Sequence, residues 1–297
     1  MPPTTPKNFY IFGSGISFSI SPTIHTAGFT HHNLAYTYEI AESRTIDDVA
    51  HLINSPSFGG ASVTMPHKLQ VHRYCSEQTE TARTIGAINT LIPRYIHCGK
   101  TEVVGDNTDW SGLYTLICRY MAISMEGEVG EEKKGLKAGL VIGAGGASRA
   151  ALYALYEAGV ERIYLVNRTI SSAETVRDDF RGLFDVIVVP SISDLPRSPE
   201  VVIGTVPAET TSEEQFTSMF KGQGLCIDMS YKPRQTPLLT VAQRHEGWAT
   251  VTGVEVLLAQ AFDQFRLWTG LEPPREEMID AILKREGEGE RVAMSML

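Results

Sequence analysis

Short apolar runs alternate along the chain with segments of helical spacing, a pattern that predicts a parallel β-sheet with crossover helices. The clearest case begins with the apolar run 139–142, which is typical of a buried parallel strand. A glycine-rich turn follows at 143–148, and residues 149–158 have helical composition. Gly159 closes that helix, because a residue without Cβ accepts the left-handed backbone of a helix end. A second strand is predicted at 163–166.

Strand, glycine turn, helix and strand together make a unit that can bind a nucleotide. Glycines let the backbone turn tightly and approach a pyrophosphate, whose charge is stabilised by the N-terminus of the helix. Ala147 and Ser148 stand where the third glycine of such a loop would fall, and small residues there still allow close packing of helix on strand. The pattern favours dinucleotide binding, and a plain βαβ crossover is the alternative.

The same alternation extends over most of the chain, so the fold class is α/β. Further strands are predicted at 9–12, 36–40, 102–104, 185–189, 201–205, 225–229 and 248–251. One more strand runs through Val63, and the segment 86–92 begins with a turn and continues as a strand. Further helices are predicted at 43–53, from Lys68, from Trp110 and over 253–270. The charged, glycine-punctuated stretch 121–135 has no apolar periodicity and predicts a linker, and 297 residues suffice for two domains.

Composition narrows the function without identifying it. The chain has ordinary globular content, with 42% hydrophobic and 21% charged residues. Its net charge of −9 offers no basic surface for nucleic acid or an anionic membrane. We find no apolar run of transmembrane length and no signal-peptide pattern, and we expect a cytoplasmic protein. The cysteines show neither metal spacing nor a close pair, which predicts no metal site; they are Cys75, Cys98, Cys118 and Cys226.

Polar residues gather where predicted strands end, the edge at which open α/β sheets bind ligands. Serines, including Ser19 and Ser21, follow the first strand, where they can cap a helix or bind a hydroxylated or carboxylate ligand. Lys68 is placed at a predicted helix start, where the dipole would lower its pKa and suit proton transfer; a solvated surface lysine is the alternative. Asn89 is a candidate ligand contact.

Three further residues have both a structural and a functional interpretation. Asp109 either caps the helix from Trp110 or pairs with Lys68 and a substrate hydroxyl. Arg168 ends the second strand of the glycine unit, where it can take the 2′-phosphate of NADP; a surface arginine is the alternative. Gln260 is either a satisfied buried amide or a contact to a substrate hydroxyl.

The chain resembles the shikimate dehydrogenases over nearly its whole length, in the order of that family's motifs. The resemblance is carried by Ser19-x-Ser21-Pro22-x-x-His25, Ser62-Val63-Thr64-x-Pro66-x-Lys68, Gly86-Ala87-Ile88-Asn89-Thr90, Gly105-Asp106-Asn107-Thr108-Asp109, the 143–147 loop, Asn167-Arg168-Thr169, Asp228-Met229-x-Tyr231-x-Pro233, and Gly253 with Gln260-Ala261. Phrases such as FGGASVT and YKPRQTPLL look most like the shikimate dehydrogenase domain of fungal pentafunctional arom polypeptides and fungal quinate dehydrogenases.

The resemblance implies reversible, NADP-dependent reduction of 3-dehydroshikimate to shikimate, with Lys68 and Asp109 as the catalytic pair. It implies a substrate-binding domain over 1–112, completed by 253–297, and a Rossmann domain over 113–252, with a cleft between them. The implied substrate contacts are Ser19, Ser21, Thr64, Asn89, Tyr231 and Gln260. The implied cofactor contacts are Glu80, Gly143, Ala144, Gly145, Gly146, Ala147, Asn167, Arg168, Thr169, Thr205, Val206, Met229 and Gly253.

The sequence departs from the family pattern at three positions. Thr26 and Ser62 stand where the family usually has asparagine, and Ser172 stands where many NADP-using members have a second basic residue. NAD is therefore an alternative cofactor, and quinate is an alternative substrate because it differs only by a hydroxyl and ring saturation. A non-catalytic metabolite sensor on the same fold is an alternative of another class. We expect a monomer or a homodimer.

Overall fold

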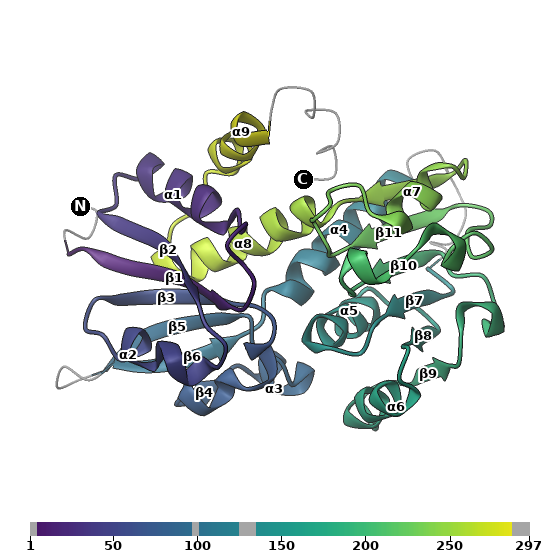
Figure 1. Ribbon diagram of the computed structural model, residues 1–297, viewed down its shortest axis with the longest axis horizontal. Coiled ribbons are helices and arrows are strands. Elements are labelled where there is room, and N and C mark those ends of the chain that lie inside the picture. The colour runs from purple at the N-terminus through teal and green to yellow at the C-terminus, as the bar shows by residue number, and fades with distance from the viewer. Residues whose placement is uncertain (1–4, 97–100, 125–134, 287–297) are drawn as a thin grey trace. The chain divides into compact units, whose positions relative to one another are not determined.

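The computed structural model describes residues 5–96, 101–124 and 135–286, and these form two compact units. Unit 1 comprises the described residues of 1–108 together with those that follow residue 259, and unit 2 comprises those of 109–259. The predicted α/β class is confirmed, since helices and strands alternate through both units (Figure 1). Among the described residues, no helix is both long and apolar enough to cross a membrane.

Unit 1 contains a mixed six-stranded sheet with the order β2-β1-β3-β5-β6-β4. The strands are β1 (Lys7–Gly13), β2 (Tyr36–Glu42), β3 (Phe58–Val63), β4 (Glu77–Gln78), β5 (Thr90–Tyr95) and β6 (Thr101–Asp106). The first three pair in parallel, whereas β5 runs antiparallel to both its neighbours. Because β1 and β3 are parallel neighbours, the chain leaves both strands at the same edge of the sheet. The segments after Gly13 and Val63 therefore lie together, and Thr64 N–H donates to the Phe12 carbonyl.

Helices from both ends of the chain complete unit 1. Its α-helices are α1 (Ser21–His31), α2 (Ala50–Ile53), α3 (Glu80–Ile85), the second part of α8 (Gly253–Thr269) and α9 (Arg275–Glu286), and its 3₁₀ turns are η1 (Ile46–Val49), η2 (His67–Leu69) and η3 (Val71–Tyr74). The helix α8 packs closely on α1, because a Cβ added to Gly28 would lie 2.7 Å from the Phe265 ring. The helix predicted over 43–53 begins only at Ile46, after a capping box formed by Thr45 and Asp48.

Unit 2 contains a six-stranded sheet in which every pair is parallel, with the order β9-β8-β7-β10-β11-β12. The strands are β7 (Gly139–Ile142), β8 (Ile163–Val166), β9 (Val186–Val189), β10 (Val201–Gly204), β11 (Gly224–Asp228) and β12 (Trp248–Val251). This is the doubly wound arrangement, in which the strand order reverses between β7 and β10 and ligands bind at the carboxyl ends there.

Both faces of this sheet are covered, which explains its continuous apolar strands. The helices of unit 2 are α4 (Asp109–Ser124), α5 (Gly146–Glu157), α6 (Ile170–Asp179), α7 (Pro237–Gln243) and the first part of α8, with 3₁₀ turns η4 (Ile192–Asp194), η5 (Ala208–Thr210) and η6 (Glu213–Gln215). Along β7, Val141 joins the core shared with α4 and α5, while Leu140 and Ile142 join the core shared with α7.

Two predicted boundaries in unit 2 are wrong. The helix after the glycine turn starts at Gly146 rather than at Arg149, because the small residues of the turn already form its first turn. The predicted linker 121–135 overlaps α4, which continues to Ser124, and its residues 125–134 lie outside the described part of the chain. Gly159 has a φ of +74°, as its predicted place at the helix end requires.

Candidate functional site

The glycine turn of unit 2 lies at the switch point of the sheet. Gly143 follows β7 with a φ of +117°, and a Cβ there would lie 2.4 Å from Thr205 Oγ1 at the end of β10. Only glycine fits this position. At Gly145, an added Cβ would meet no described atom within 4 Å, so the backbone before α5 is open to approach. The turn therefore presents backbone N–H groups and a helix N-terminus, which suit a phosphate.

A cavity of about 790 Å³ extends from this turn along the carboxyl ends of β8, β9 and β10. Four of the predicted cofactor residues line it, namely Gly143, Asn167, Arg168 and Val206. Its lining also contains Pro190, Ser191, Ile192, Ser193, Pro207, Thr210, Thr211, Glu214, Gln215, Phe216 and Ser218. The sequence analysis did not identify the residues after β9 as candidates. They directly follow a predicted strand, and the carboxyl end of a parallel strand is where such sheets bind ligands, so their position could have identified them.

The loop after β11 carries Met229 and Tyr231 and is fixed at both ends by Asp228. One oxygen of this buried carboxylate accepts from Ser230 N–H at 3.0 Å, and the other accepts from Thr236 Oγ1 at 2.7 Å. Burial raises the pKa of Asp228 to about 6, while the bonds from Thr236 and Ser230 oppose that shift. Thr236 in turn caps α7 by accepting from Leu239 N–H.

Gly253, the first residue of α8, lies directly against this loop. A Cβ there would come within 2.8 Å of the Met229 carbonyl oxygen and 2.5 Å of that of Ser230. Two predicted cofactor residues, Met229 and Gly253, are thus neighbours within unit 2. The predicted residues Ala144, Gly146, Ala147, Thr169 and Thr205 also lie in unit 2, in or beside the strand ends described above.

In unit 1, the predicted substrate residues lie in segments that follow strands. Ser19 and Ser21 are buried at the start of α1, where Ser21 N–H donates to Ser19 Oγ at 3.3 Å. Thr64 follows β3, and a Cβ on Gly13 would lie 2.4 Å from its methyl group. The close approach of the two strand ends requires glycine at position 13.

Lys68 does not begin an α-helix, so the helix predicted from this residue is wrong. It lies in the three-residue 3₁₀ turn η2. Its carbonyl accepts from Ile88 N–H at 2.9 Å, which removes it from any α-helical ladder. The preceding His67 is fully buried and its Nε2 lies 2.9 Å from Ser43 Oγ, which agrees with a structural histidine that anchors the turn.

Asn89 and Gln260 meet in a buried cluster of unit 1. Asn89 Nδ2 donates to Gln260 Oε1 at 3.2 Å, and Thr108 Oγ1 donates to the same oxygen at 3.0 Å. Thr108 N–H donates to Asn89 Oδ1 at 2.7 Å. Residues far apart in the sequence thus form one polar cluster, and Gln264, one helical turn after Gln260, belongs to it as well.

The remaining predicted residues are divided between the units. Lys68 and the exposed Glu80 belong to unit 1, whereas Asp109, at the start of α4, and Tyr231 belong to unit 2. The pairing of Lys68 with Asp109, and the contacts of Glu80 with a cofactor and of Tyr231 with a substrate, stay predictions.

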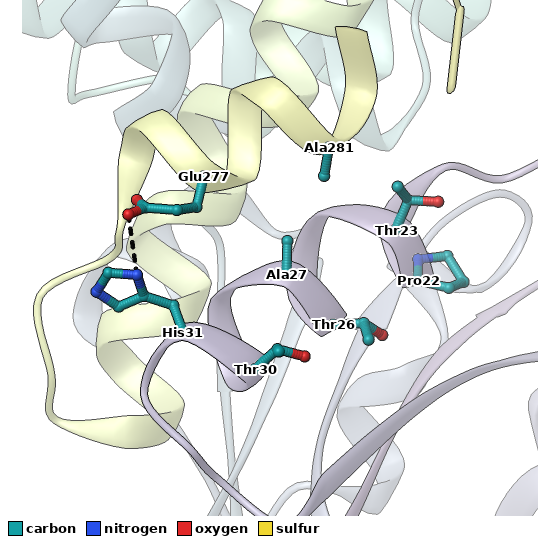
Figure 2. A pocket seen from close by; sticks show the side chains of 8 residues that line it. All are labelled: Pro22, Thr23, Thr26, Ala27, Thr30, His31, Glu277 and Ala281. Carbon is teal, nitrogen blue, oxygen red and sulfur yellow. Dashed lines mark ion pairs between the residues drawn. The ribbon is translucent and has the colours of Figure 1, made fainter. Parts of the chain in front are cut away.

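The departures at Thr26 and Ser62 have different surroundings. Thr26 is exposed and lines an open groove of about 640 Å³ between α1 and α9, where His31 pairs with Glu277 at 2.9 Å (Figure 2). Ser62 is buried at the end of β3 and bonds to Tyr38 and Gln264. Of these two positions, only Ser62 bonds to the buried cluster of Asn89 and Gln260.

Three family models match successive parts of the chain. A model described as the shikimate dehydrogenase substrate binding domain matches residues 11–91, and one described as shikimate / quinate 5-dehydrogenase matches residues 129–237. A third, the shikimate 5′-dehydrogenase C-terminal domain, matches residues 253–283. The chain belongs to the shikimate dehydrogenase family. This is a family of oxidoreductases that act on a CH–OH group, and the predicted resemblance is confirmed.

Among curated relatives, the pentafunctional AROM polypeptide of Mycosarcoma maydis is 40% identical over 92% of this chain. This chain covers 18% of that polypeptide, so it spans less than a fifth of its length. A solved structure of dehydroquinate dehydratase and shikimate dehydrogenase from S. pombe AroM is 36% identical, with a TM-score of 0.74, over 94% of this chain and 53% of that one. Shikimate 5-dehydrogenase from Thermus thermophilus was solved in complex with NADP(H) and shikimate. It is 26% identical, with a TM-score of 0.71, and the match covers 94% of this chain and 99% of that one.

Proposed function

We propose that this chain is a shikimate dehydrogenase that interconverts 3-dehydroshikimate and shikimate with NADP. The observation that carries the proposal is the family match, joined to the cluster of Asn89 and Gln260 in the part matched to the substrate-binding model and its C-terminal counterpart. A ring with several hydroxyls and a carboxylate needs convergent neutral donors and acceptors, which serines, threonine and amides supply.

The cofactor would supply the hydride and lie along the carboxyl ends of β7, β8 and β10. Gly143 and the N-terminus of α5 fit its pyrophosphate, and the cavity beyond them has room for an adenosine. Arg168 lines that cavity, where a guanidinium can bind a 2′-phosphate in a bidentate manner. This residue favours NADP, and the absence of a basic residue at Ser172 keeps NAD as the alternative.

The reaction also needs a group that transfers a proton to the carbonyl oxygen as it becomes a hydroxyl. We assign this step to Lys68, whose ammonium is a compact donor on a flexible stem. Asp109 would accept a hydrogen bond from the same hydroxyl and orient it. Tyr231, Ser19, Ser21 and Thr64 would hold the substrate in register, so that positioning contributes much of the rate.

The proposal is tested by following the nicotinamide absorbance with shikimate or quinate as substrate and NADP or NAD as cofactor. We expect the largest kcat/KM for shikimate with NADP. A preference for quinate would support the second activity that the family description names. Absence of turnover with all four combinations, in a protein that is folded by circular dichroism, would instead support a non-catalytic sensor.

A further inference from the structure

The cavity at the carboxyl ends of β8, β9 and β10 has two charged residues in its lining, and they are of opposite sign. Arg168 follows β8, and the exposed Glu214 belongs to η6. Both residues and the rest of the lining belong to unit 2. A ligand that is only anionic would be attracted by one of them and repelled by the other. The lining therefore suits a ligand that carries an anionic group and, elsewhere, a hydrogen-bond donor.

The residue after Glu214, Gln215, is held in place by a capping box. The side chain of Ser212 accepts from Gln215 N–H, and Gln215 Oε1 accepts from Ser212 N–H at 3.0 Å. These two bonds fix the short turn η6 and, with it, the side chain of Gln215. A side chain that is already fixed loses less conformational freedom when a ligand binds.

The backbone also determines which end of the Gln215 amide remains for a ligand. Ser212 N–H can only donate, so the atom that it meets is the amide oxygen, and the other atom is the nitrogen. Among the described residues, none accepts from this NH₂ group. Gln215 therefore brings two unused donor hydrogens to the lining of the cavity.

Glu214 is the complementary group. A hydrogen bond from the Ser212 side chain lowers the pKa of Glu214, so its carboxylate is ionised at neutral pH and can only accept. Adjacent residues of the lining thus present an acceptor and a donor. Adenine has the matching pattern along one edge, since its N6 amino group donates and a neighbouring ring nitrogen accepts.

The apolar side chains of the cavity suit the faces of a flat ring. Ile192, after β9, and Val206, after β10, are half-buried and pack on the core shared with α7. Phe216, directly after Gln215, is buried in the same core and also lines the cavity. Such surfaces bind a ring by burial, whereas the polar groups at its edge decide which ring fits.

We infer that Glu214 and Gln215 recognise the adenine base of the cofactor, with the carboxylate accepting from the N6 amino group and the amide donating to the neighbouring ring nitrogen. This rests on the proposed function only in taking a nicotinamide adenine dinucleotide as the ligand. Arg168 would hold the 2′-phosphate at another part of the same cavity. The two charges of the lining then serve the two polar ends of one adenosine 2′-phosphate.

The first test measures binding by calorimetry, with NADP and with its hypoxanthine analogue, in which a carbonyl oxygen replaces the amino group. We expect the wild type to bind NADP at least about tenfold more tightly, because the analogue places an acceptor against the carboxylate. In Glu214→Gln the new amide can donate or accept, so the preference should fall below about threefold. Glu246→Gln removes an exposed carboxylate of unit 2 outside the cavity lining and should keep the preference of the wild type.

The second test uses Gln215→Glu, which keeps an acceptor for Ser212 N–H but replaces the donor by an acceptor. We expect an unchanged urea midpoint and a rise of at least about tenfold in the Kd of NADP and, by the same factor, of NAD. Gln223→Glu, the same exchange at an exposed residue of unit 2 outside the cavity lining, should change neither constant. A larger rise for NADP than for NAD would indicate repulsion of the additional phosphate and would overturn the contact from Gln215.

Binding and turnover separate this inference from the proposed function. Equal affinity of the wild type for NADP and its hypoxanthine analogue overturns the recognition of adenine, and so does an unchanged preference in Glu214→Gln. A wild type that prefers NADP in calorimetry but turns over neither shikimate nor quinate overturns only the proposed function.

Discussion

Asp228 gives unit 2 a stability that depends on pH, and the substitution Asp228→Asn tests it. Its pKa is raised from 3.8 to about 6, chiefly by burial. The protonated form is therefore favoured in the folded state, and the contribution of Asp228 to stability is complete below pH 3.8 and is lost as pH rises through about 6. The full loss is 2.303RT times the difference between these pKa values, or about 3 kcal/mol.

The measurement compares urea unfolding of wild type and Asp228→Asn, followed by tryptophan fluorescence, at about pH 4.5 and about pH 7.5. Asparagine keeps the shape of the aspartate side chain but does not titrate. Because all other groups titrate in both proteins, the comparison isolates the effect of Asp228. With the two pKa values, linkage predicts that the wild type loses about 2 kcal/mol relative to the variant over this interval. The absolute difference at one pH also contains the loss of one of the two acceptor oxygens of Asp228, so only its change with pH is diagnostic.

Asp185→Asn is a matched control, since it neutralises an exposed carboxylate of the same unit. Its stability difference from the wild type should change by less than about 0.5 kcal/mol between the two pH values. A flat difference for Asp228→Asn would refute the reasoning that burial dominates over the bonds from Thr236 and Ser230. A change in the opposite direction would indicate that these bonds lower the pKa below 3.8.

Three other substitutions test the site and the fold. Lys68→Ala should lower kcat at least about a hundredfold, while calorimetry should show that shikimate still binds. The control Lys221→Ala, at an exposed lysine, should leave kcat unchanged. Near-normal turnover of Lys68→Ala would contradict the proton-transfer role of Lys68. Arg168→Ala should raise the KM for NADP at least about tenfold more than that for NAD, and equal effects would contradict a 2′-phosphate contact. Gly60→Ala should lower the free energy of unfolding in urea by about 3 kcal/mol. The reason is that Gly60 has a φ of +144° and an added Cβ would lie 2.5 Å from Trp268 Nε1. An unchanged urea midpoint would show that the indole ring of Trp268 can move aside.

Local signals allowed much of the fold to be predicted from the sequence. The strands of unit 2 are short apolar runs because both their faces are buried, and Gly143 and Gly159 mark backbone that other residues adopt only with strain. These features depend on neighbours in the sequence.

Features that depend on distant partners were not predictable in this way. Lys68 was expected to start a helix, but its carbonyl bonds to Ile88, twenty residues later, and no local pattern encodes that bond. Gln264 was not identified because a single polar residue in an apolar stripe has many interpretations. Its spacing of four from Gln260 places both amides on one face of α8, and this signal was available.

The helix α8 also determines the order in which the chain can fold during synthesis. The described part of unit 2 ends at residue 259, so all its described strands have been made once that residue has left the ribosome. Unit 1 began earlier but lacks Gln264, Phe265 and Trp268, which supply the acceptor of Ser62, the ring against Gly28 and the donor to the Leu91 carbonyl. Of the two units, the one that begins earlier along this chain is therefore completed later. Until α8 arrives, the apolar side chains of β1, β3 and α1 that pack against it stay exposed, and this part of unit 1 needs protection from aggregation.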